Sequence, residues 1–509
     1  MAVCTQALGG GETDGGRGAV RGAVRGAGAG AGAITGAFAL RDWVRAARVS
    51  RVDMVGIGDS NQAFVGIGWD HGCTKALSEA FPLFATGLHS AGENLGQSQG
   101  LGYRSGVLST ACCVPNFVYS GAPACWDRCM SADVLMFPMN YLHLPAGQVG
   151  GGPANQGMYM EAGHPLNVNA RLLFEVTHGS GPEASGVFAP MIRLGQWPFS
   201  PITQMPSVTT WAESCGWARV DTEIPAGLRN MAINPRFTPW GIDMVGPCLI
   251  YTQRLINLDR PTGVSFTTLY ARGSQSARDM ALGFQTASDD QLTMFFSLLR
   301  ARQGEVKSTL IRINTGLNDV SEPLGSLGPQ QVPNGSSAAA FADNLHAIVD
   351  RLRGVWVLNG WNDSELHFLF AVSHPIATPD LDRLVEYRVA AEALAASMPR
   401  CAVVRMDVMT SADEMLSRGW YHLNGSDRYH LAQAGYETLA ARELDALIVA
   451  ACEPDFSGDG VVDTQDLVMI LSMYGAESNP HHSCDLDGDG RVSTQDLVSF
   501  LGGFGRDCR

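Results

Sequence analysis

The chain has 509 residues and a formal net charge of −15, from 35 basic and 50 acidic residues. This length exceeds what one small core organises and predicts two or three folding units. The acidic excess argues against a nucleic-acid partner, because a phosphate-binding surface needs clustered Lys and Arg. No apolar run approaches the roughly 20 residues that cross a bilayer, so we expect no transmembrane segment.

The first 50 residues are dominated by Gly, Ala and Arg, with almost no large apolar side chain before Phe38. A segment of this composition buries too little apolar surface to offset the entropy lost on ordering. We therefore expect a disordered lead over residues 1–50, without the apolar stretch of a secretory signal.

The twelve cysteines include four that crowd together, at Cys112, Cys113, Cys125 and Cys129. Their spacing fits no zinc-ligand set that recurs in the chain and favours disulfide partners, which persist in oxidising compartments. We therefore expect an extracellular or cell-envelope location.

Five short apolar runs rich in β-branched residues predict buried parallel strands, at 52–58, 264–270, 308–314, 366–373 and 402–408. Apolar residues recur with helical spacing at 289–303, 338–353, 379–397 and 431–450. Strands alternating with helices predict an α/β domain over residues 51–450, built on a doubly wound, five-stranded parallel sheet.

About 200 residues separate the helix after the first of these strands from the second strand, far too many for a structureless loop. From 165 to 262 polar and apolar residues alternate among Gly and Pro, which predicts antiparallel strands. We expect an insertion over residues 90–262, β-rich in its second half. It would project from the carboxyl edge of the sheet, where it could wall a substrate cleft.

Ser60 lies in the segment VGIGDSNQ, directly after the first predicted strand. By itself the tripeptide Gly-Asp-Ser favours a helix cap. A nucleophilic serine needs a general base, a group that orients the base, and donors for the developing oxyanion. In an open α/β sheet these groups lie where strands end, so later strand ends are the places to search.

Each later strand end offers one such part. The second predicted strand ends at LYARGSQS, which contains Gly273, and the third at INTGLNDV, which contains Asn318. After the fifth, Asp427 and His430 stand three residues apart at the head of the last predicted helix, a spacing that lets both reach one pocket from a single turn.

Two further histidines compete for the cleft. His374 ends the fourth predicted strand, and His422 precedes His430 by eight residues. We interpret both as packed or solvated side chains.

The ordered blocks GDS at 58–60, GLND at 316–319 and DRYH at 427–430 resemble those of the SGNH hydrolases, also called GDSL-like esterases. The resemblance covers roughly residues 50–450 apart from the insertion, and it implies a flavodoxin-like sheet. It also implies that Ser60 attacks an ester carbonyl, that His430 takes its proton and that Asp427 orients His430.

The same resemblance assigns the oxyanion to the amides of Ser60 and Gly273 and to the side chain of Asn318. The second block is the weakest, since Gly273 is only the best-placed glycine after its strand. The family's GDSL reads GDSN here, so Asn61 stands where an apolar residue is usual.

The C-terminal segment is acidic and duplicated. DFSGDGVVDTQDLVMIL from Asp455 returns as DLDGDGRVSTQDLVSFL from Asp485, and each copy holds oxygen ligands at calcium-loop positions 1, 3, 5, 7, 9 and 12 with a glycine at the sixth. The predicted ligands of the first site are Asp455, Ser457, Asp459, the Val461 carbonyl, Asp463 and Asp466. Those of the second are Asp485, Asp487, Asp489, the Arg491 carbonyl, Ser493 and Asp496.

An Asp at the twelfth position and the lack of a helix before each loop resemble type I dockerin modules, over residues 452–509. That resemblance implies a small α-helical module with two structural calcium ions, which docks to a cohesin-like partner or a surface scaffold. A calcium-stabilised end module without a partner remains open.

These patterns together predict a secreted serine esterase that removes acyl groups, foremost acetyl, from a polysaccharide and needs no cofactor for catalysis. The prediction of a carbohydrate substrate depends only on the association of dockerin-like modules with polysaccharide-degrading enzymes. Two alternatives remain: a lipid esterase or acyltransferase of the same fold, and a noncatalytic scaffold or adhesion protein.

Overall fold

The computed structural model describes part of the chain. The described residues are 33–63, 68–89, 107–108, 142–144, 149–150, 157–161, 171–180, 187–193, 202–204, 207–209, 212, 216–224, 236–245, 248–271, 275–290, 292–293, 296, 306–320, 336–376, 381–422, 427–450, 454–457, 461–476, 484, 486 and 491–505.

The five predicted parallel strands are confirmed. They are β2 (Arg51–Gly58), β15 (Gly263–Ala271), β16 (Val306–Thr315), β17 (Leu366–Val372) and β18 (Cys401–Val404). They pair in parallel in the order β18-β17-β16-β2-β15. The last strand is shorter than predicted, because the backbone turns at Arg405, whose carbonyl accepts the amides of Val408 and Met409, into helix α10 (Met406–Met409).

The sheet is larger than the predicted five strands. Strand β3 (Leu83–His89) continues the parallel part beside β15, and antiparallel β14 (Cys248–Asn257), β8 (Leu172–Ser180) and β12 (Gly216–Ile224) follow it. Among the described residues the sheet has eleven strands. Part of the insertion therefore extends the main sheet at its side, where we expected a separate unit above the carboxyl edge.

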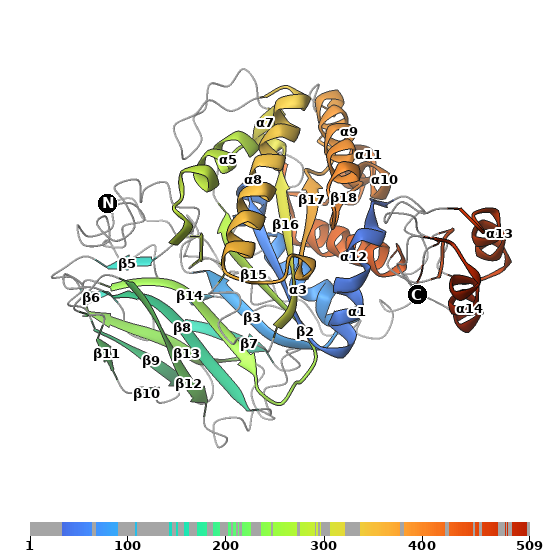
Figure 1. Cartoon of the computed structure of the whole chain (residues 1–509). Coiled ribbons are helices and arrows are strands. Elements are labelled where there is room, and N and C mark those ends of the chain that lie inside the picture. Colours follow the sequence, from blue (N-terminus) through green and yellow to red (C-terminus); the bar gives the residue numbers. More distant parts are fainter. Residues whose placement is uncertain are drawn as a thin grey trace.

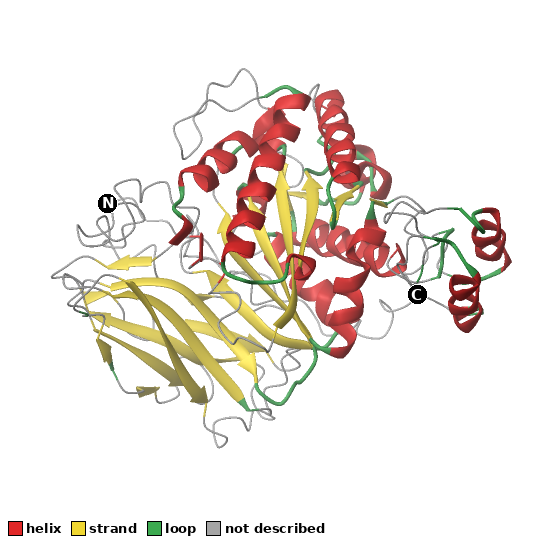
Figure 2. Ribbon diagram, viewed as in Figure 1, coloured by secondary structure: helices red, strands yellow, loops and turns green. Residues whose placement is uncertain are grey.

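The other described strands of the insertion form a second sheet. Its path is β10-β9-β13-β7-β4, with β11 on β9 and β6 on β13. The strands are β4 (Val107–Leu108), β6 (Val149–Gly150), β7 (Gly157–Glu161), β9 (Val187–Arg193), β10 (Ile202–Gln204), β11 (Val208–Thr209) and β13 (Arg236–Val245), while β5 (Leu142–Leu144) pairs with β14. Figure 2 shows these strands beside the α/β layers, with little helix among them.

Helices cover both faces of the parallel strands, as a doubly wound sheet requires (Figure 1). One face carries α1 (Arg41–Val49), α3 (Trp69–Ala80) and α12 (Gln433–Ala450), and the other α5 (Ala277–Thr286), α8 (Ala338–Leu358) and α9 (Leu381–Ser397). Alternate strand residues enter opposite cores, as Leu310 and Ile311 do. The helix predicted over 289–303 lies mostly outside the described residues.

Residues 33–50 correct the expected disordered lead. They form β1 (Ile34–Thr35), a 3-10 helix (Ala37–Leu40) and α1. Trp43, Val44 and Ala47 lie on one face of α1 and are buried, and Trp43 Nε1 donates to the Asp53 carbonyl at 3.0 Å. The average composition of residues 1–50 concealed this short amphipathic segment.

The two C-terminal repeats form one small module. Helices α13 (Thr464–Ser472) and α14 (Thr494–Gly503) pack around Val462, Ile470, Val492 and Phe500. The pairing is reciprocal: the Gly475 amide donates to the Val492 carbonyl, and the Gly505 amide to the Val462 carbonyl, both at 2.8 Å. The module lies beyond α12, at the right of Figure 1.

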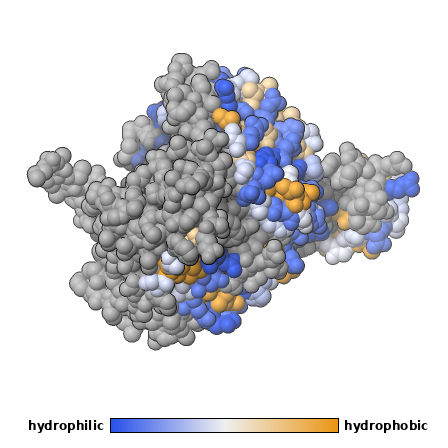
Figure 3. Space-filling model, turned by 60° about the vertical axis from the view of Figure 1, so that its left-hand side comes forward, coloured by the Kyte–Doolittle hydropathy of each residue, from blue (hydrophilic) through white to orange (hydrophobic). Residues whose placement is uncertain are grey.

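The described surface in Figure 3 is mostly hydrophilic, with small separate hydrophobic patches. Within the described part of the chain, no helix has the length and apolar character that crossing a membrane requires. The cysteines Cys73, Cys401 and Cys484 are buried, whereas the cluster at 112–129 lies outside the described residues.

Candidate active site

Three strand ends meet at one edge of the sheet. Gly58 of β2 is in register with Ala271 of β15 on one side and with Asn314 of β16 on the other. Ser60 and Gly273 each follow these aligned ends by two residues. The register therefore brings the first and third predicted blocks to the same edge as the end of β15, and Gly273 of the second block lies outside the described residues.

The turn into α2 (Ser60–Ala63) is built around Asp59. The Asp59 amide donates to the Asn314 carbonyl at 3.2 Å, and its carbonyl accepts the Gln62 amide at 3.1 Å. Its Oδ1 accepts the Asn61 amide at 2.9 Å, which is a capping contact. Asp59 is thus the cap of α2, which leaves Ser60 as the first helical residue; the Ser60 side chain lies outside what the structure describes.

Glycine is required immediately before this turn. A Cβ at Gly58 would lie 2.4 Å from the Asn314 carbonyl oxygen, closer than side chains approach in proteins. The contact fixes β2 against β16 where both strands end.

Asp59 is a fully buried carboxyl group. Asn314 Nδ2 donates to its Oδ1 at 3.1 Å, and its Oδ2 has no hydrogen-bond partner among the described residues. Burial raises the pKa of Asp59 to about 7, and the negative charge of Asp319 adds to this, against the lowering effect of the bond from Asn61. The group beside Ser60 is therefore largely neutral in mildly acidic solution.

The third block leads into a short helix, α7 (Leu317–Val320), through Gly316 at φ 111°, a conformation that favours glycine. Asn318 Nδ2 donates to the Gln275 carbonyl at 2.9 Å. An amide nitrogen carries two hydrogens, so one remains for another acceptor. Asn318 thus touches the segment that follows Gly273.

Asp319 ties the same two loops together. Its buried carboxylate accepts the amide of Ala277, the first residue of α5, at 3.0 Å, and also the hydroxyls of Ser336 and Thr315. Burial raises the pKa of Asp319 to about 6, although these hydrogen bonds act in the opposite direction.

Asp427 and His430 lie on a short strand, which corrects the expected helical turn. Strand β20 (Asp427–Leu431) pairs with β19 (Tyr421–His422), and α12 begins only at Gln433. Tyr421 pairs with Leu431 and His422 with Asp427, so residues 428–430 bulge from the ladder. The bulge, rather than a helix, sets the spacing between Asp427 and His430.

The backbones of α2 and β20 are in contact, so the segment that begins with Ser60 lies beside the one that carries His430. His430 is half-buried, and the Asp427 side chain lies outside what the structure describes. The roles of Ser60, His430, Asp427 and the oxyanion donors stay predictions.

The competing histidines also lie near this edge. His374 follows β17 and is 1% exposed, with its ring centroid 6.2 Å from that of Tyr421. His422 is half-buried and faces Asp427 across the ladder.

A buried ion pair holds α12 against the sheet beneath the site. Arg312 Nε and Nη2 donate to the two Glu443 oxygens, both at 2.8 Å, and Nη1 donates to Gln62 of α2 at 3.4 Å. The guanidinium lies 4.1 Å from the Trp69 ring centroid. Three helices and β16 thus share one cation.

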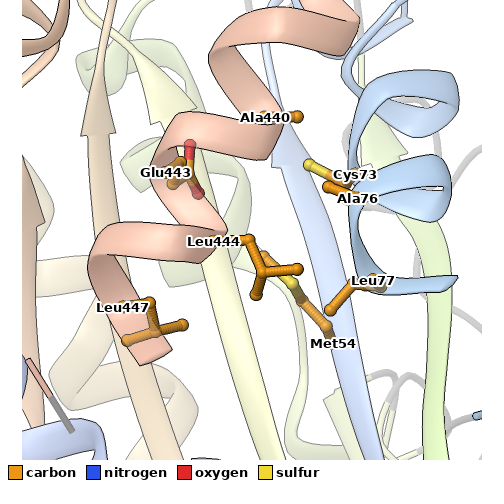
Figure 4. A pocket seen from close by; sticks show the side chains of 8 residues that line it. All are labelled: Met54, Cys73, Ala76, Leu77, Ala440, Glu443, Leu444 and Leu447. Carbon is orange, nitrogen blue, oxygen red and sulfur yellow. The ribbon is translucent and has the colours of Figure 1, made fainter. Parts of the chain in front are cut away.

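A small pocket opens between α3 and α12 (Figure 4). Its lining comprises Met54, Cys73, Ala76, Leu77, Ala440, Leu444 and Leu447, with Glu443 as the charged member. It lies beside the middle of β2, away from the strand ends, and both Glu443 oxygens are taken by Arg312. We do not assign it a substrate.

Sequence reasoning missed two groups that shape this site: Asn314, which donates to Asp59, and Tyr436, whose hydroxyl donates to Asn61 Oδ1 at 2.7 Å. A signal existed for Asn314, a polar residue near the end of an apolar strand. Tyr436 lies in the apolar stripe of α12, and this sequence pattern predicts a core residue.

The calcium loops are described in part. Asp459, Asp485, Asp487 and Asp489 lie outside the described residues, and within the described residues no three His, Cys, Asp or Glu side chains gather as a metal site. Asp466 and Asp496 are buried at equivalent positions. Each accepts two loop amides, those of Ser457 and Asp463 in the first copy, and those of Leu486 and Ser493 in the second.

This arrangement fits a hard cation. The carboxylate at the twelfth loop position is buried and accepts one amide at each oxygen, and a carboxylate oxygen with one such bond keeps a lone pair that a cation could bind. Asp455, at the first position, is also buried, and the Ser457 hydroxyl donates to it at 3.1 Å.

No protein-family model and no curated protein matches the sequence. Among solved structures, a peptidoglycan O-acetylesterase shares 12% identity, with 81% of this chain and 97% of that chain covered and a TM-score of 0.45. A carbohydrate acetylesterase from Sinorhizobium meliloti shares 13% identity, with 35% and 75% covered and a TM-score of 0.22.

A family two carbohydrate esterase from Clostridium thermocellum, solved with cellohexaose, shares 12% identity, with 59% of this chain and 96% of that chain covered and a TM-score of 0.24. Identities and TM-scores of this size establish neither the family nor the activity of this chain.

Proposed function

We propose that the chain is a serine esterase that hydrolyses carboxylic esters, foremost acetyl groups on a polysaccharide. One observation supports the enzymatic part: Gly58 is in register with Ala271 and Asn314, and α2 contacts β20, so the described segments that carry or adjoin the predicted blocks lie close together. A noncatalytic scaffold would not require this convergence.

In the proposed reaction, Ser60 Oγ forms a bond to the acyl carbon while its proton passes to His430, which Asp427 orients. The alcohol leaves with the proton from His430, and an acyl-serine remains. Water then attacks the acyl carbon and gives one proton to His430; the bond from the acyl carbon to Ser60 Oγ breaks, Ser60 takes that proton from His430, and the carboxylic acid departs and ionises in solvent. Asn318 and the amides of Ser60 and Gly273 stabilise the oxyanion in both steps.

The polysaccharide part of the proposal depends on the dockerin-like module. The extracellular or cell-envelope location depends on that module and on the clustered cysteines at 112–129. A cohesin-like or scaffold partner for this module would hold the esterase near an insoluble polymer. No cofactor is proposed for the ester chemistry.

Acetate release separates the substrate classes. We expect the full chain to release acetate from acetylated xylan and from an aryl acetate, and to leave a long-chain aryl ester nearly intact. Preference for the long-chain ester would favour the lipid esterase instead. If an acceptor alcohol lowers the release of free acetate and an acetylated acceptor forms, the chain is an acyltransferase. No turnover of any ester would favour the noncatalytic scaffold.

For the C-terminal module we propose two calcium ions, one in each loop, held by the twelve oxygen ligands that the sequence predicts. The two divalent ions would offset half of the net charge of −8 that 11 acidic and 3 basic residues give to residues 453–509. Their contribution is to folding, because buried loop carboxylates repel one another without a cation.

Calorimetric titration of the metal-free full chain should therefore show two calcium ions bound per chain. Asp466→Ala and Asp496→Ala occupy equivalent positions and serve as each other's control, since each should remove one ion and leave the other. Chelator should also make the module sensitive to protease while esterase activity persists. A wild-type chain without calcium binding, or two variants that both keep two ions, would contradict the proposal.

A further inference from the structure

Asn61, the residue after Ser60, is a polar side chain in an unusual place. It is 1% exposed, and an unpaired buried amide costs free energy. Its Oδ1 accepts the hydroxyl of Tyr436 at 2.7 Å, and Tyr436 is itself 0% exposed. The Asn61 side chain is therefore oriented by a partner that lies 375 positions away in the chain.

The Tyr436 hydroxyl has a second neighbour at the site. The Leu431 amide donates to it at 3.4 Å, and that amide belongs to the peptide bond whose carbonyl is His430. One hydroxyl thus touches the peptide that follows the predicted base and the side chain that follows the predicted nucleophile.

From Asn61 the path continues into the sheet. The Asn61 amide donates to Asp59 Oδ1 at 2.9 Å, and Asn314 Nδ2 donates to the same oxygen at 3.1 Å. The sequence Leu431, Tyr436, Asn61, Asp59, Asn314 is therefore a continuous buried path from β20, through α12 and α2, to the end of β16.

Tyr436 is fixed in place by close packing on α3. The Trp69 ring meets its ring edge-on, with centroids 5.5 Å apart. A Cβ at Gly72 would lie 2.5 Å from the Tyr436 carbonyl oxygen, so α3 and α12 approach backbone to backbone. Neither helix can shift without disturbing the hydroxyl, which makes the contact with Asn61 a rigid one.

We propose that Asn61 and Tyr436 are positioning residues that hold Ser60 and His430 at their working separation. The inference depends on the proposed function, because it gives a role to these residues only if Ser60 and His430 react. The physical reason is geometric, since a nucleophile and base displaced by about 1 Å lose on the order of a hundredfold in rate. The hydrogen bond between Tyr436 and Asn61 also fixes the orientation of the Asn61 side chain, which an apolar contact at this position would not do.

The test is a double-mutant cycle on hydrolysis of an aryl acetate by the full chain. We expect Tyr436→Phe and Asn61→Leu each to lower kcat on the order of 10- to 100-fold, with KM changed less than about 2-fold. The double variant should lose no more than the worse single variant, because both substitutions break the same contact. If Tyr436→Phe alone fails to fold, the double variant, which removes both polar partners together, should have the same kcat as Asn61→Leu, and that comparison still tests the proposal.

A control separates positioning from stability. Trp43→Phe removes another buried hydrogen bond on the same face of the sheet, from α1 to the Asp53 carbonyl, and should lower stability while kcat stays at the wild-type value. Wild-type kcat in both single variants, or losses that multiply in the double variant, would overturn the positioning role alone. A wild-type chain without esterase activity would overturn the proposed function and this inference with it.

Discussion

Ser60→Ala and His430→Ala should each lower kcat for an aryl acetate on the order of a thousandfold or more, and the double variant should be no slower than either. The reason is that nucleophile and base act as one unit, so removing either removes the same step. Steady-state kinetics on the full chain, with circular dichroism to verify folding, measure the effect.

The neighbouring histidines are the matched controls for His430. His374→Ala and His422→Ala should keep kcat within a few-fold of wild type, since His374 is buried against Tyr421 and neither histidine belongs to the predicted DRYH block. His422 is the sharper control because it faces Asp427 across the ladder. Loss of activity in His422→Ala with full activity in His430→Ala would move the base to His422, and full activity in Ser60→Ala would end the serine mechanism.

Asp59→Asn should stabilise the protein increasingly as pH rises from about 5 to about 8. Burial raises the pKa of Asp59 from 3.8 to about 7 in the folded chain, so the folded state binds more protons than the unfolded state between these values. The stability contributed by the neutral acid is fully present below 3.8 and is lost as pH rises through about 7. Over that whole window the loss is on the order of 4 kcal/mol.

Asn imitates the neutral acid: its Oδ1 can still accept from Asn61 and Asn314, and its Nδ2 replaces an oxygen that has no partner among the described residues. Urea unfolding at about pH 5 and about pH 8 should therefore show the advantage of Asp59→Asn over wild type growing by about 3 kcal/mol.

Asp407→Asn is the control for this comparison. Burial alone would raise the pKa of Asp407, but the hydrogen bond from Arg405 and the charge of Arg388 hold it below its ordinary value. This variant should lose stability about equally at both pH values. An Asp59→Asn variant whose difference from wild type does not change with pH would show that Asp59 is ionised in the folded chain across this range.

The parallel strands could be predicted because each buried strand must be apolar on both faces, and runs such as 308–314 carry that pattern locally. Strand β3 was not predicted, because its sequence LFATGLH contains Thr, Gly and His and resembles a loop. Its place beside β15 is a long-range pairing that no local pattern contains. The same holds for β14, β8 and β12, whose alternation predicted strands but not which sheet they join.

Two other differences between the predicted and observed structure come from averaging composition over a long segment and from assuming a helical turn. The disordered lead was extended too far because Trp43, Val44 and Ala47 are few among the glycines and alanines of residues 1–50. Asp427 and His430 were expected in a helical turn because α12 follows so closely, and the pairing of Tyr421 with Leu431 delays that helix.

For the site, motif order was enough to propose Ser60, Asn318 and His430, whose roles stay predictions, because chemistry restricts which residue types can serve. The groups that hold them could not be found in the same way. Asn61 and Tyr436 are distant in sequence, and a tyrosine in an apolar helix stripe has the same pattern whether or not its hydroxyl has a partner. Such supporting contacts depend on tertiary packing and appear only in the fold.

Covalent labelling tests the central claim most directly. Wild-type protein treated with a fluorophosphonate probe should gain one adduct, which peptide mass spectrometry places on Ser60, and His430→Ala should label far more slowly because the serine lacks its base. Rapid labelling at Ser60 that requires His430 is the result expected of a serine esterase. A wild-type chain that stays unlabelled, or labels at another residue, would contradict the account.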